Sequence, residues 1–248
     1  MTERGLDGKV IFITGGARGQ GATEARLCHS LGAKVVITDV LVEQGQAVAD
    51  EVDGLFVRHD VTSPEQWSDA VDAALDRFGR IDGLVNNAGV FFIKPMMDTT
   101  LDEYRNLTEI NQTGVFLGMQ AVGRVMLEQG SGSMVNISSI AGLGGAGGFA
   151  FAYTASKWAV RGMSKSAAIE FGPHGVRVNS VHPGIIETPM LEQFTALGDS
   201  WHQTLRDAIP MGRTAQASEV AELVVFLLSD LSSYCSGHEF VVDGARNA

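Results

Sequence analysis

The 248-residue sequence has little cysteine and no recognisable metal motif. Its only cysteines, Cys28 and Cys235, show no metal-ligand spacing. We therefore expect two reduced, buried thiols, with a disulfide as the weaker alternative. The six histidines are scattered and form no His-Glu-x-x-His pattern, so a metal site has no support in the sequence.

Long apolar runs and basic side chains are also scarce. No apolar run reaches the ~18 residues needed to span a bilayer, and residues 1–5 lack the charged-then-apolar pattern of a signal peptide. The formal net charge is −11, which disfavours nucleic acid and anionic membrane surfaces, because both attract Lys and Arg. We therefore expect a cytoplasmic protein whose partner is a small molecule, with no nucleic acid and no membrane.

Glycine and apolar residues, in contrast, are abundant, with 30 glycines and a hydrophobic fraction of 45%. Short β-branched runs alternate with helical segments, which is typical of parallel strands joined by right-handed crossovers. The expected strands are Val10–Thr14, Lys34–Asp39, Leu55–Arg58, Asp82–Asn86, Ser133–Ser138, Val176–His182 and Glu239–Val242. The longest expected helices are Leu101–Glu128 and Tyr153–Phe171. The pattern predicts one doubly wound α/β domain over residues 1–248, with a seven-stranded parallel sheet and helices on both faces.

A glycine-rich turn joins the first expected strand to the first helix, in the string Thr14-Gly15-Gly16-Ala17-Arg18-Gly19-Gln20-Gly21. Gly15 permits a tight turn, Gly19 allows the backbone to approach a pyrophosphate, and Gly21 allows the helix to pack closely on the sheet. The start of the helix then offers unpaired amides to the phosphates. The turn predicts a dinucleotide site; an ordinary glycine-rich βα turn is the alternative.

Asp39 ends the second expected strand, 18 residues after Gly21. A carboxylate there can accept hydrogen bonds from the adenosine ribose hydroxyls and would repel a ribose phosphate, which favours NAD over NADP. Arg18 argues the other way, because a basic side chain in this turn can contact that phosphate. It can equally pair with the pyrophosphate or with Asp39.

Tyr153 and Lys157 are four residues apart on an expected helix, so the ammonium can lie beside the phenol. A phenol with a pKa near ~10 is a poor base at neutral pH unless a nearby cation stabilises the phenolate. The pair is therefore a candidate for proton transfer in alcohol and carbonyl chemistry. Alone, this spacing is common by chance.

Together these residues resemble the short-chain dehydrogenase/reductase family, and the likeness runs in order through the whole chain. The matching segments are Thr14–Gly21, Asp60-Val61, Asn86-Asn87-Ala88-Gly89, Ile110-Asn111-Gln112-Thr113-Gly114, Ile137-Ser138-Ser139, Tyr153-x-x-x-Lys157 and Pro183-Gly184-Ile185-Ile186-Glu187-Thr188. The resemblance implies a Rossmann-type fold, a nicotinamide cofactor and a homotetramer. It implies cofactor contacts by Gly15, Arg18, Gly19, Gln20, Gly21, Asp39, Val40, Asp60, Val61, Asn87, Ala88, Gly89, Tyr153, Lys157, Pro183, Gly184, Ile186 and Thr188.

The resemblance also implies a catalytic set of Asn111, Ser139, Tyr153 and Lys157. Tyr153 would exchange the proton with the alcohol or carbonyl, and Lys157 would lower the Tyr153 pKa and hold the nicotinamide ribose. Ser139 would hydrogen-bond the substrate oxygen, while Ser138 would be structural. Asn111 would bend its helix and hold a water that links Lys157 to solvent.

Two features depart from the family pattern. The interval from Ser139 to Tyr153 is 14 residues, one more than is usual, which we attribute to an insertion in the stretch from Gly142 to Gly148. Gln20 stands where an aliphatic residue is common. It leaves the phosphate-binding amides in place but can alter packing beneath the nicotinamide.

Apolar residues surround the expected catalytic side chains. With Ser139 and Tyr153, the predicted substrate contacts are Phe91, Phe149, Ile185 and Met190. A pocket of this kind suits a bulky alicyclic or steroid-like secondary alcohol or ketone, although each apolar residue could instead belong to the core or a subunit contact. The segment 188–210 is expected to act as a lid over bound substrate.

Within the family, the likeness is closest to bacterial hydroxysteroid dehydrogenases, through the strings Thr113–Met119, Ser156-Lys157-Trp158 and Asn179–Gly184. The prediction is an NAD-dependent oxidoreductase that interconverts a secondary alcohol and a ketone. One alternative is a 3-oxoacyl thioester reductase, a class that usually prefers NADPH, which Asp39 disfavours. Another is a non-catalytic nucleotide-binding scaffold, which has no need of all four catalytic residues.

Overall fold

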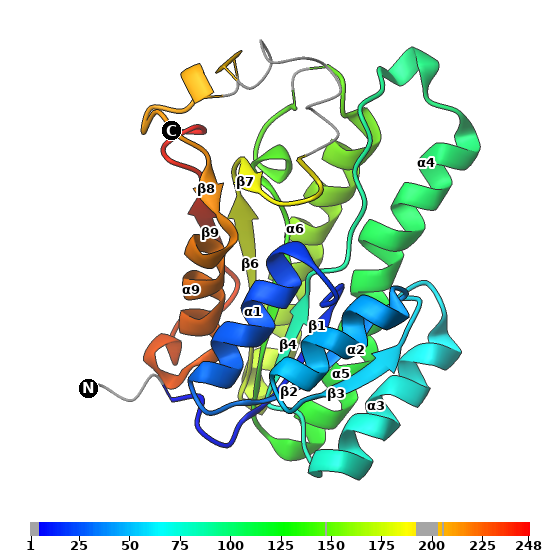
Figure 1. Cartoon of the computed structure of the whole chain (residues 1–248), viewed down its shortest axis with the longest axis vertical. Helices are drawn as coiled ribbons and strands as arrows, with labels where there is room; N and C mark the ends of the chain where they lie inside the picture. Colours follow the sequence, from blue (N-terminus) through cyan, green and yellow to red (C-terminus); the bar gives the residue numbers. More distant parts are fainter. Residues whose placement is uncertain (1–4, 147, 192–202, 205) are drawn as a thin grey trace.

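The computed structural model describes residues 5–146, 148–191, 203–204 and 206–248. Its main sheet has seven strands in the order β3-β2-β1-β4-β5-β6-β9, and every neighbouring pair is parallel (Figure 1). The strands are β1 Val10–Thr14, β2 Lys34–Asp39, β3 Leu55–Arg58, β4 Gly83–Asn86, β5 Gly132–Ile137, β6 Val176–Pro183 and β9 Glu239–Val242. The predicted α/β fold with a seven-stranded parallel sheet is confirmed.

The strand order reverses between β1 and β4, which are neighbours although two strands separate them in sequence. Ile13 of β1 pairs with Ile37 of β2 on one side and with Val85 of β4 on the other. Ligands of open parallel sheets bind outside the carboxyl ends of the strands at such a switch point. The glycine-rich turn after β1 and the Asn87–Gly89 segment after β4 both begin there.

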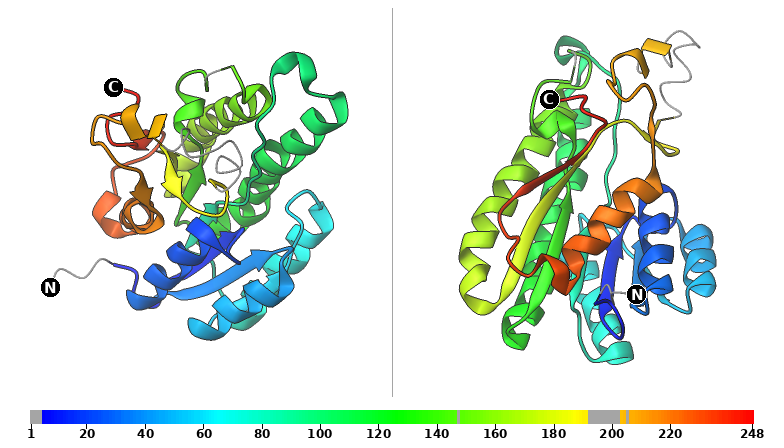
Figure 2. Two further views of the ribbon diagram at one scale, coloured as in Figure 1. Left: turned by 45° about the horizontal axis from the view of Figure 1, so that its top comes forward. Right: turned by 90° about the vertical axis from the view of Figure 1, so that its left-hand side faces the viewer.

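Successive residues of a strand point to opposite faces, and the sheet therefore separates two hydrophobic cores. Ile11 and Ile13 of β1 lie in one core, whereas Val10 and Phe12 lie in the other. The first core is covered by α1 Gly19–Ser30, α2 Val42–Glu51 and α9 Ala217–Leu228 (Figure 2). The second is covered by α3 Pro64–Phe78, α5 Gly114–Gln129 and α6 Phe151–Phe171.

The expected single helix Leu101–Glu128 is interrupted, so this prediction is wrong in one respect. α4 Leu101–Thr108 leads into a π-helical turn, Glu109–Thr113, before α5 begins at Gly114. A π-helical turn accommodates an extra residue and is frequent at functional sites. Asn111 lies inside this turn and is completely buried.

Several other features were not predicted or fall outside the described residues. The helices α2 and α9 were not foreseen, and neither was a second sheet of two short strands, β7 Ile186–Glu187 and β8 Ala215–Gln216.

Much of the expected lid, residues 192–202 and 205, lies outside the described residues. Cys28 is buried and Cys235 partly buried, and both are free thiols. Within the described part of the chain, no helix is long and apolar enough to cross a membrane, and no three acidic, His or Cys side chains are grouped to hold a metal ion.

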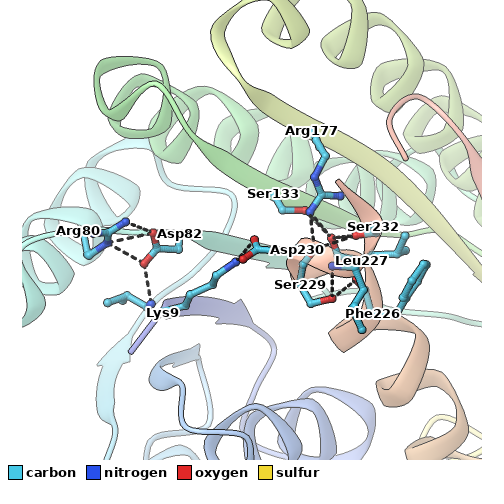
Figure 3. Close-up of polar contacts among 12 residues, drawn as sticks. Lys9, Arg80, Asp82, Ser133, Arg177, Phe226, Leu227, Ser229, Asp230 and Ser232 are labelled. Atoms are coloured by element: carbon cyan, nitrogen blue, oxygen red, sulfur yellow. Dashed lines mark hydrogen bonds and ion pairs between the residues drawn. The ribbon is translucent and has the colours of Figure 1, made fainter. Parts of the chain in front are cut away.

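At the amino ends of the strands, charged side chains are paired with charges or with helix ends (Figure 3). Arg80 Nε donates to Asp82 Oδ2 at 2.9 Å. The Arg177 guanidinium donates to the carbonyl oxygens of Leu227 at 2.8 Å and of Ser229 at 3.1 Å. These carbonyls lie at the end of α9, where a cation is favourable to the helix dipole.

Candidate active site

Three elements at the carboxyl edge of the sheet supply the four candidate catalytic residues. The π-helical turn carries Asn111, the loop after β5 carries Ser139, and α6 carries Tyr153 and Lys157. The Asn111, Ser139 and Lys157 residues are 0%, 9% and 4% exposed, and Tyr153 is partly exposed. Polar groups buried in this way must find hydrogen-bond partners within the protein.

Ser139 and Tyr153 are joined by a side-chain hydrogen bond. Ser139 Oγ also accepts the backbone amide of Ala141 at 3.1 Å, which leaves its own O–H to donate toward the phenol. Ser138 is turned away, because its Oγ donates to the Lys157 carbonyl at 2.9 Å. The longer interval from Ser139 to Tyr153 therefore does not separate the two hydroxyl groups, and Ser138 has the structural role expected of it.

The ammonium group of Lys157 lies over the Tyr153 ring, 5.5 Å from its centroid, and donates to the Ile137 carbonyl at 2.8 Å. Burial lowers the pKa of Lys157 to about 8. Burial also raises the pKa of Tyr153 to about 12, and the hydrogen bond from Ser139 opposes this rise. Desolvation therefore sets the direction of the Tyr153 pKa shift, because the Lys157 ammonium faces the ring and is itself desolvated. That Lys157 stabilises the phenolate remains a prediction.

Asn111 joins three segments through its side-chain amide. Its Oδ1 accepts the Val90 amide at 2.8 Å, and its Nδ2 donates to the Val90 carbonyl at 2.8 Å and to Ser156 Oγ at 3.3 Å. A Cβ atom at Gly89 would lie 3.3 Å from Asn111 Oδ1 and 3.7 Å from Lys157 Nζ. The glycine thus keeps the space between these side chains clear. A water that links Lys157 to Asn111 remains a prediction.

The glycine-rich turn has little room for side chains where the backbone bends. Gly15 and Gly19 have φ angles of 64° and 57°, in the left-handed region that favours glycine. A Cβ atom at Gly21 would lie 2.5 Å from both Asn87 Nδ2 and the Gly15 carbonyl oxygen. Arg18 occupies the cap position of α1 without a side-chain cap, so the first amides of the helix can face a ligand.

The Asp39 carboxylate lies beside this turn and is only partly buried. Its Oδ2 accepts the Ala17 amide at 3.0 Å and its Oδ1 accepts the Leu41 amide at 3.0 Å. Each oxygen keeps a second lone pair for a further donor. Val40, the next residue, is 52% exposed, and Arg18 is also exposed.

The remaining cofactor candidates lie around the same switch point. Asp60 Oδ1 accepts the Thr62 amide at 3.0 Å, while Val61 is buried against Gly114. Asn87 Nδ2 donates to the Thr14 carbonyl at 2.9 Å and so fixes the start of the turn.

The segment after β6 also approaches the turn. A Cβ atom at Gly19 would lie 3.4 Å from Pro189 Cδ and 3.7 Å from Thr188 Cβ. Gly184 donates its amide to the Val242 carbonyl at 2.8 Å, and Ile186 is buried. The structure therefore brings Thr188 to the glycine-rich turn.

One partner of the turn was missed in the sequence. Gln20 Nε2 donates to Glu24 Oε1 at 3.0 Å, and Glu24 is completely buried in α1. Burial raises the pKa of Glu24 to about 8. The sequence signal for this pair is the spacing, because a glutamate four residues after Gln20 lies on the same face of the expected helix.

The four predicted apolar substrate contacts do not all share one place. The Phe91 ring packs edge-on against the Tyr153 ring, with centroids 4.9 Å apart. Phe149 belongs to the neighbouring loop, where its carbonyl accepts the Lys94 amide at 2.7 Å, and Met190 is 38% exposed. Ile185 instead lines a separate cavity of about 300 Å³ near the C-terminus, to which none of the four candidate catalytic residues contributes.

Comparisons with known proteins show which proteins this chain is similar to. A family model described as enoyl-(acyl carrier protein) reductase matches residues 15–245. A relative named 3-alpha-(or 20-beta)-hydroxysteroid dehydrogenase, from Mycobacterium tuberculosis, is 49% identical and covers 98% of this chain and 91% of its own length. Another relative, the NADP-dependent (R)-specific alcohol dehydrogenase of Lentilactobacillus kefiri, is 40% identical over the full length of both chains. The crystal structure of a short-chain type dehydrogenase/reductase from Mycobacterium marinum has a TM-score of 0.94 at 34% identity and covers 99% of this chain and 98% of that one.

Proposed function

The chain belongs to the short-chain dehydrogenase/reductase family, and from this premise we propose that it is an NAD-dependent oxidoreductase that interconverts a bulky secondary alcohol and its ketone. The observation that carries the proposal is the hydrogen-bonded pair Ser139–Tyr153 with the buried Lys157 ammonium over the phenol ring. The name of the 49%-identical relative supports a steroid-like or other alicyclic substrate.

The residues at the switch point fit a nicotinamide dinucleotide. A Cβ atom at Gly21 would collide with Gly15 and Asn87, so glycine there allows the first turn of α1 to pack closely on the glycine-rich turn. The uncapped amides of α1 suit the pyrophosphate, and Asp39 suits the adenosine ribose. Contacts with the Asp60-Val61, Asn87–Gly89 and Pro183–Thr188 segments, and with Tyr153 and Lys157, complete the proposed cofactor site.

In the oxidation direction, Tyr153 takes the proton of the substrate hydroxyl, and the Ser139 O–H donates to the substrate oxygen. A bound NAD would supply the acceptor for the hydride of the carbinol carbon. Lys157 stabilises the negative charge of the Tyr153 phenolate and donates to the nicotinamide ribose. Asn111 holds the Val90 segment and α6 in place around this set.

The test of this function is NADH formation by the purified protein with hydroxysteroids, cyclic alcohols and a 3-hydroxyacyl thioester. We expect selective turnover of a hydroxysteroid or a cyclic alcohol. Turnover of the thioester alone would replace the substrate class with that of the 3-oxoacyl thioester reductases. Tight NADH binding with no turnover of any substrate would contradict the enzyme proposal in favour of a scaffold.

The preference for NAD over NADP is tested by removing the Asp39 carboxylate. Asp39→Ala should lower the ratio of kcat/KM for NAD to that for NADP by roughly 10-fold or more, because it loses hydrogen bonds to the ribose and the repulsion of a phosphate. Asp39→Asn is the matched control, since it keeps an acceptor for the Ala17 or Leu41 amide but removes the charge. An unchanged ratio in both variants would contradict the assignment of Asp39.

The homotetramer also remains a proposal. Phe116 of α5 and Trp158 and Ile169 of α6 are 47%, 45% and 80% exposed. Exposed apolar side chains on these two helices support their pairing across a two-fold interface. Sedimentation equilibrium of the purified chain would show the mass of the assembly, and a monomer would contradict the proposal.

A further inference from the structure

His182 is completely buried on β6 beside the candidate active site, and the chemistry proposed above gives it no role. Its Nδ1 lies 2.9 Å from the Ser139 carbonyl oxygen, and its Nε2 lies 2.9 Å from Ser180 Oγ. Ser180 and His182 are two residues apart on the strand and therefore point to the same face of the sheet. The imidazole thus links the centre of β6 to the residue that is hydrogen-bonded to Tyr153.

The partners of His182 decide which ring nitrogen carries the proton. A carbonyl oxygen only accepts hydrogen bonds, so Nδ1 must carry the hydrogen that Ser139 receives. In the neutral ring Nε2 then accepts, and Ser180 Oγ donates to it. The alternative acceptor for Ser180, the His238 carbonyl, is more distant at 3.5 Å, which favours the bond to the imidazole.

The surroundings of His182 favour the neutral ring. Burial lowers the pKa of His182. The charged groups that face it are Glu239 of β9, which raises the pKa, and Arg161 and Lys157 of α6, which lower it. A neutral ring with a single N–H can keep one hydrogen bond to Ser180 and one to Ser139 without a change of protonation.

The backbone around Ser139 is held at both ends by β6. The amide of Ser138 donates to the Val181 carbonyl at 2.7 Å, and the carbonyl of Ser139 accepts from His182 at 2.9 Å. Between them, Ser139 Oγ accepts the Ala141 amide. The hydroxyl hydrogen of Ser139 can still reorient, and the Ser139 side chain is hydrogen-bonded to Tyr153.

We propose that His182 is a positioning residue, which holds the Ser139 peptide through its Nδ1–H so that the Ser139 hydroxyl faces Tyr153 and the substrate oxygen. Ser180 is its partner and keeps the ring in the required tautomer. The inference rests on the proposed function, because it assigns a task to a side chain that does not itself touch the reacting atoms. Misplacement of a reacting group by about 1 Å can cost roughly 100-fold in rate.

Three substitutions at one position separate positioning from packing. His182→Asn places an amide N–H near the position of Nδ1, His182→Gln places it near Nε2, and His182→Leu has no donor. We expect kcat to fall by roughly 10- to 100-fold in His182→Leu and His182→Gln, and by less than about 3-fold in His182→Asn. The Kd for NADH should stay within about 2-fold of wild type in all three. A purely structural role predicts equal losses that follow the melting temperature, and that result, or an undiminished kcat in His182→Leu, would overturn the proposal.

Two further measurements keep the inference testable if His182→Leu does not fold or if the alcohols are not turned over. Long-range ¹H–¹⁵N spectra of histidine-labelled wild-type protein at pH 7 should show His182 as the neutral Nδ1–H tautomer. An Nε2–H tautomer or a charged ring would overturn the inference without any activity assay.

Ser180→Ala should lower kcat less than His182→Gln does, because it removes the partner of Nε2 and leaves the Nδ1–H donor in place. Absence of turnover in wild type would refute the proposed function alone.

Discussion

The two edges of the sheet differ in the exposure and the pairing of their charged side chains. At the amino edge, Lys9 pairs with Asp230 at 2.6 Å and Arg80 pairs with Asp82 (Figure 3). At the carboxyl edge, Lys157 is 4% exposed, and within the part of the chain that the structure describes no carboxylate lies within 4.0 Å of its ammonium. Exposed ion pairs cost the fold little, whereas a desolvated charge without an ion-pair partner destabilises it and marks a candidate functional site.

The pKa of Lys157 indicates how much the burial of its ammonium costs the fold. Burial lowers the pKa from its ordinary 10.5 to about 8, which corresponds to roughly 3 kcal/mol. Because the folded-state pKa lies below the unfolded one, the ammonium destabilises the fold at pH 7. That destabilisation is relieved as the pH rises from about 8 to above 10.5.

Lys157→Met should have the largest effect on activity. We expect kcat/KM to fall by roughly 1,000-fold or more, because the variant lacks the cation that stabilises the phenolate. The same change should raise the melting temperature, since it removes a buried, unpaired charge. Steady-state kinetics and thermal unfolding of one preparation check both effects. A lower melting temperature together with retained activity would show that Lys157 stabilises the fold and is not needed for activity, which would contradict the comparison.

Parts of the fold were predictable because they depend on neighbouring residues. The bounds of β1, β2 and β3 agree with the predicted ones, since runs of β-branched residues are bounded there by glycines and charged residues. α9 was missed because its second half, residues 223–228, is uniformly apolar, and a short buried apolar run does not distinguish helix from strand. The π-helical turn was missed because one inserted residue hardly alters the hydrophobic period.

The candidate site likewise has parts that depend on neighbouring residues and parts that depend on distant ones. The glycine-rich turn and the Tyr153–Lys157 pair are local patterns, and their geometry could be expected from spacing. The contact of His182 with Ser139 joins β6 to the loop after β5, and the bond of Gln20 to Glu24 depends on which face of α1 is buried. The raised pKa of Tyr153 could not be foreseen either, because desolvation depends on the whole surroundings.

Gly21→Ala should have the next largest effect, and it acts on the cofactor rather than on the chemistry. The added Cβ atom would lie 2.5 Å from the Gly15 carbonyl oxygen, so the turn must shift. We expect the Kd for NADH to weaken by roughly 10- to 100-fold, since the amides of the turn lose their alignment. Gly162→Ala in α6 is the matched control, because no atom lies within 4 Å of its added Cβ. Equal NADH affinity in the two variants would contradict the assignment of the turn.

Arg177→Met tests the amino edge and should have the smallest effect on activity. It removes hydrogen bonds from the guanidinium to the carbonyls of Leu227 and Ser229 at the end of α9. We expect the free energy of unfolding to fall by about 2 kcal/mol, with kcat and the Kd for NADH within about 2-fold of wild type. Urea denaturation and kinetics check the two halves of this prediction. A kcat below this range would show that the substitution at the amino edge also affects the active site, so that the two edges are not independent.

The most direct test of the account is turnover and NADH binding by Tyr153→Phe, measured on the same preparation. The phenyl ring keeps the packing against Phe91 and lacks only the hydroxyl that bonds Ser139. The account predicts that kcat falls by roughly 1,000-fold or more while the Kd for NADH stays within about 2-fold of wild type. Turnover close to that of wild type would show that Tyr153 is not the proton-transfer group and would contradict the central claim.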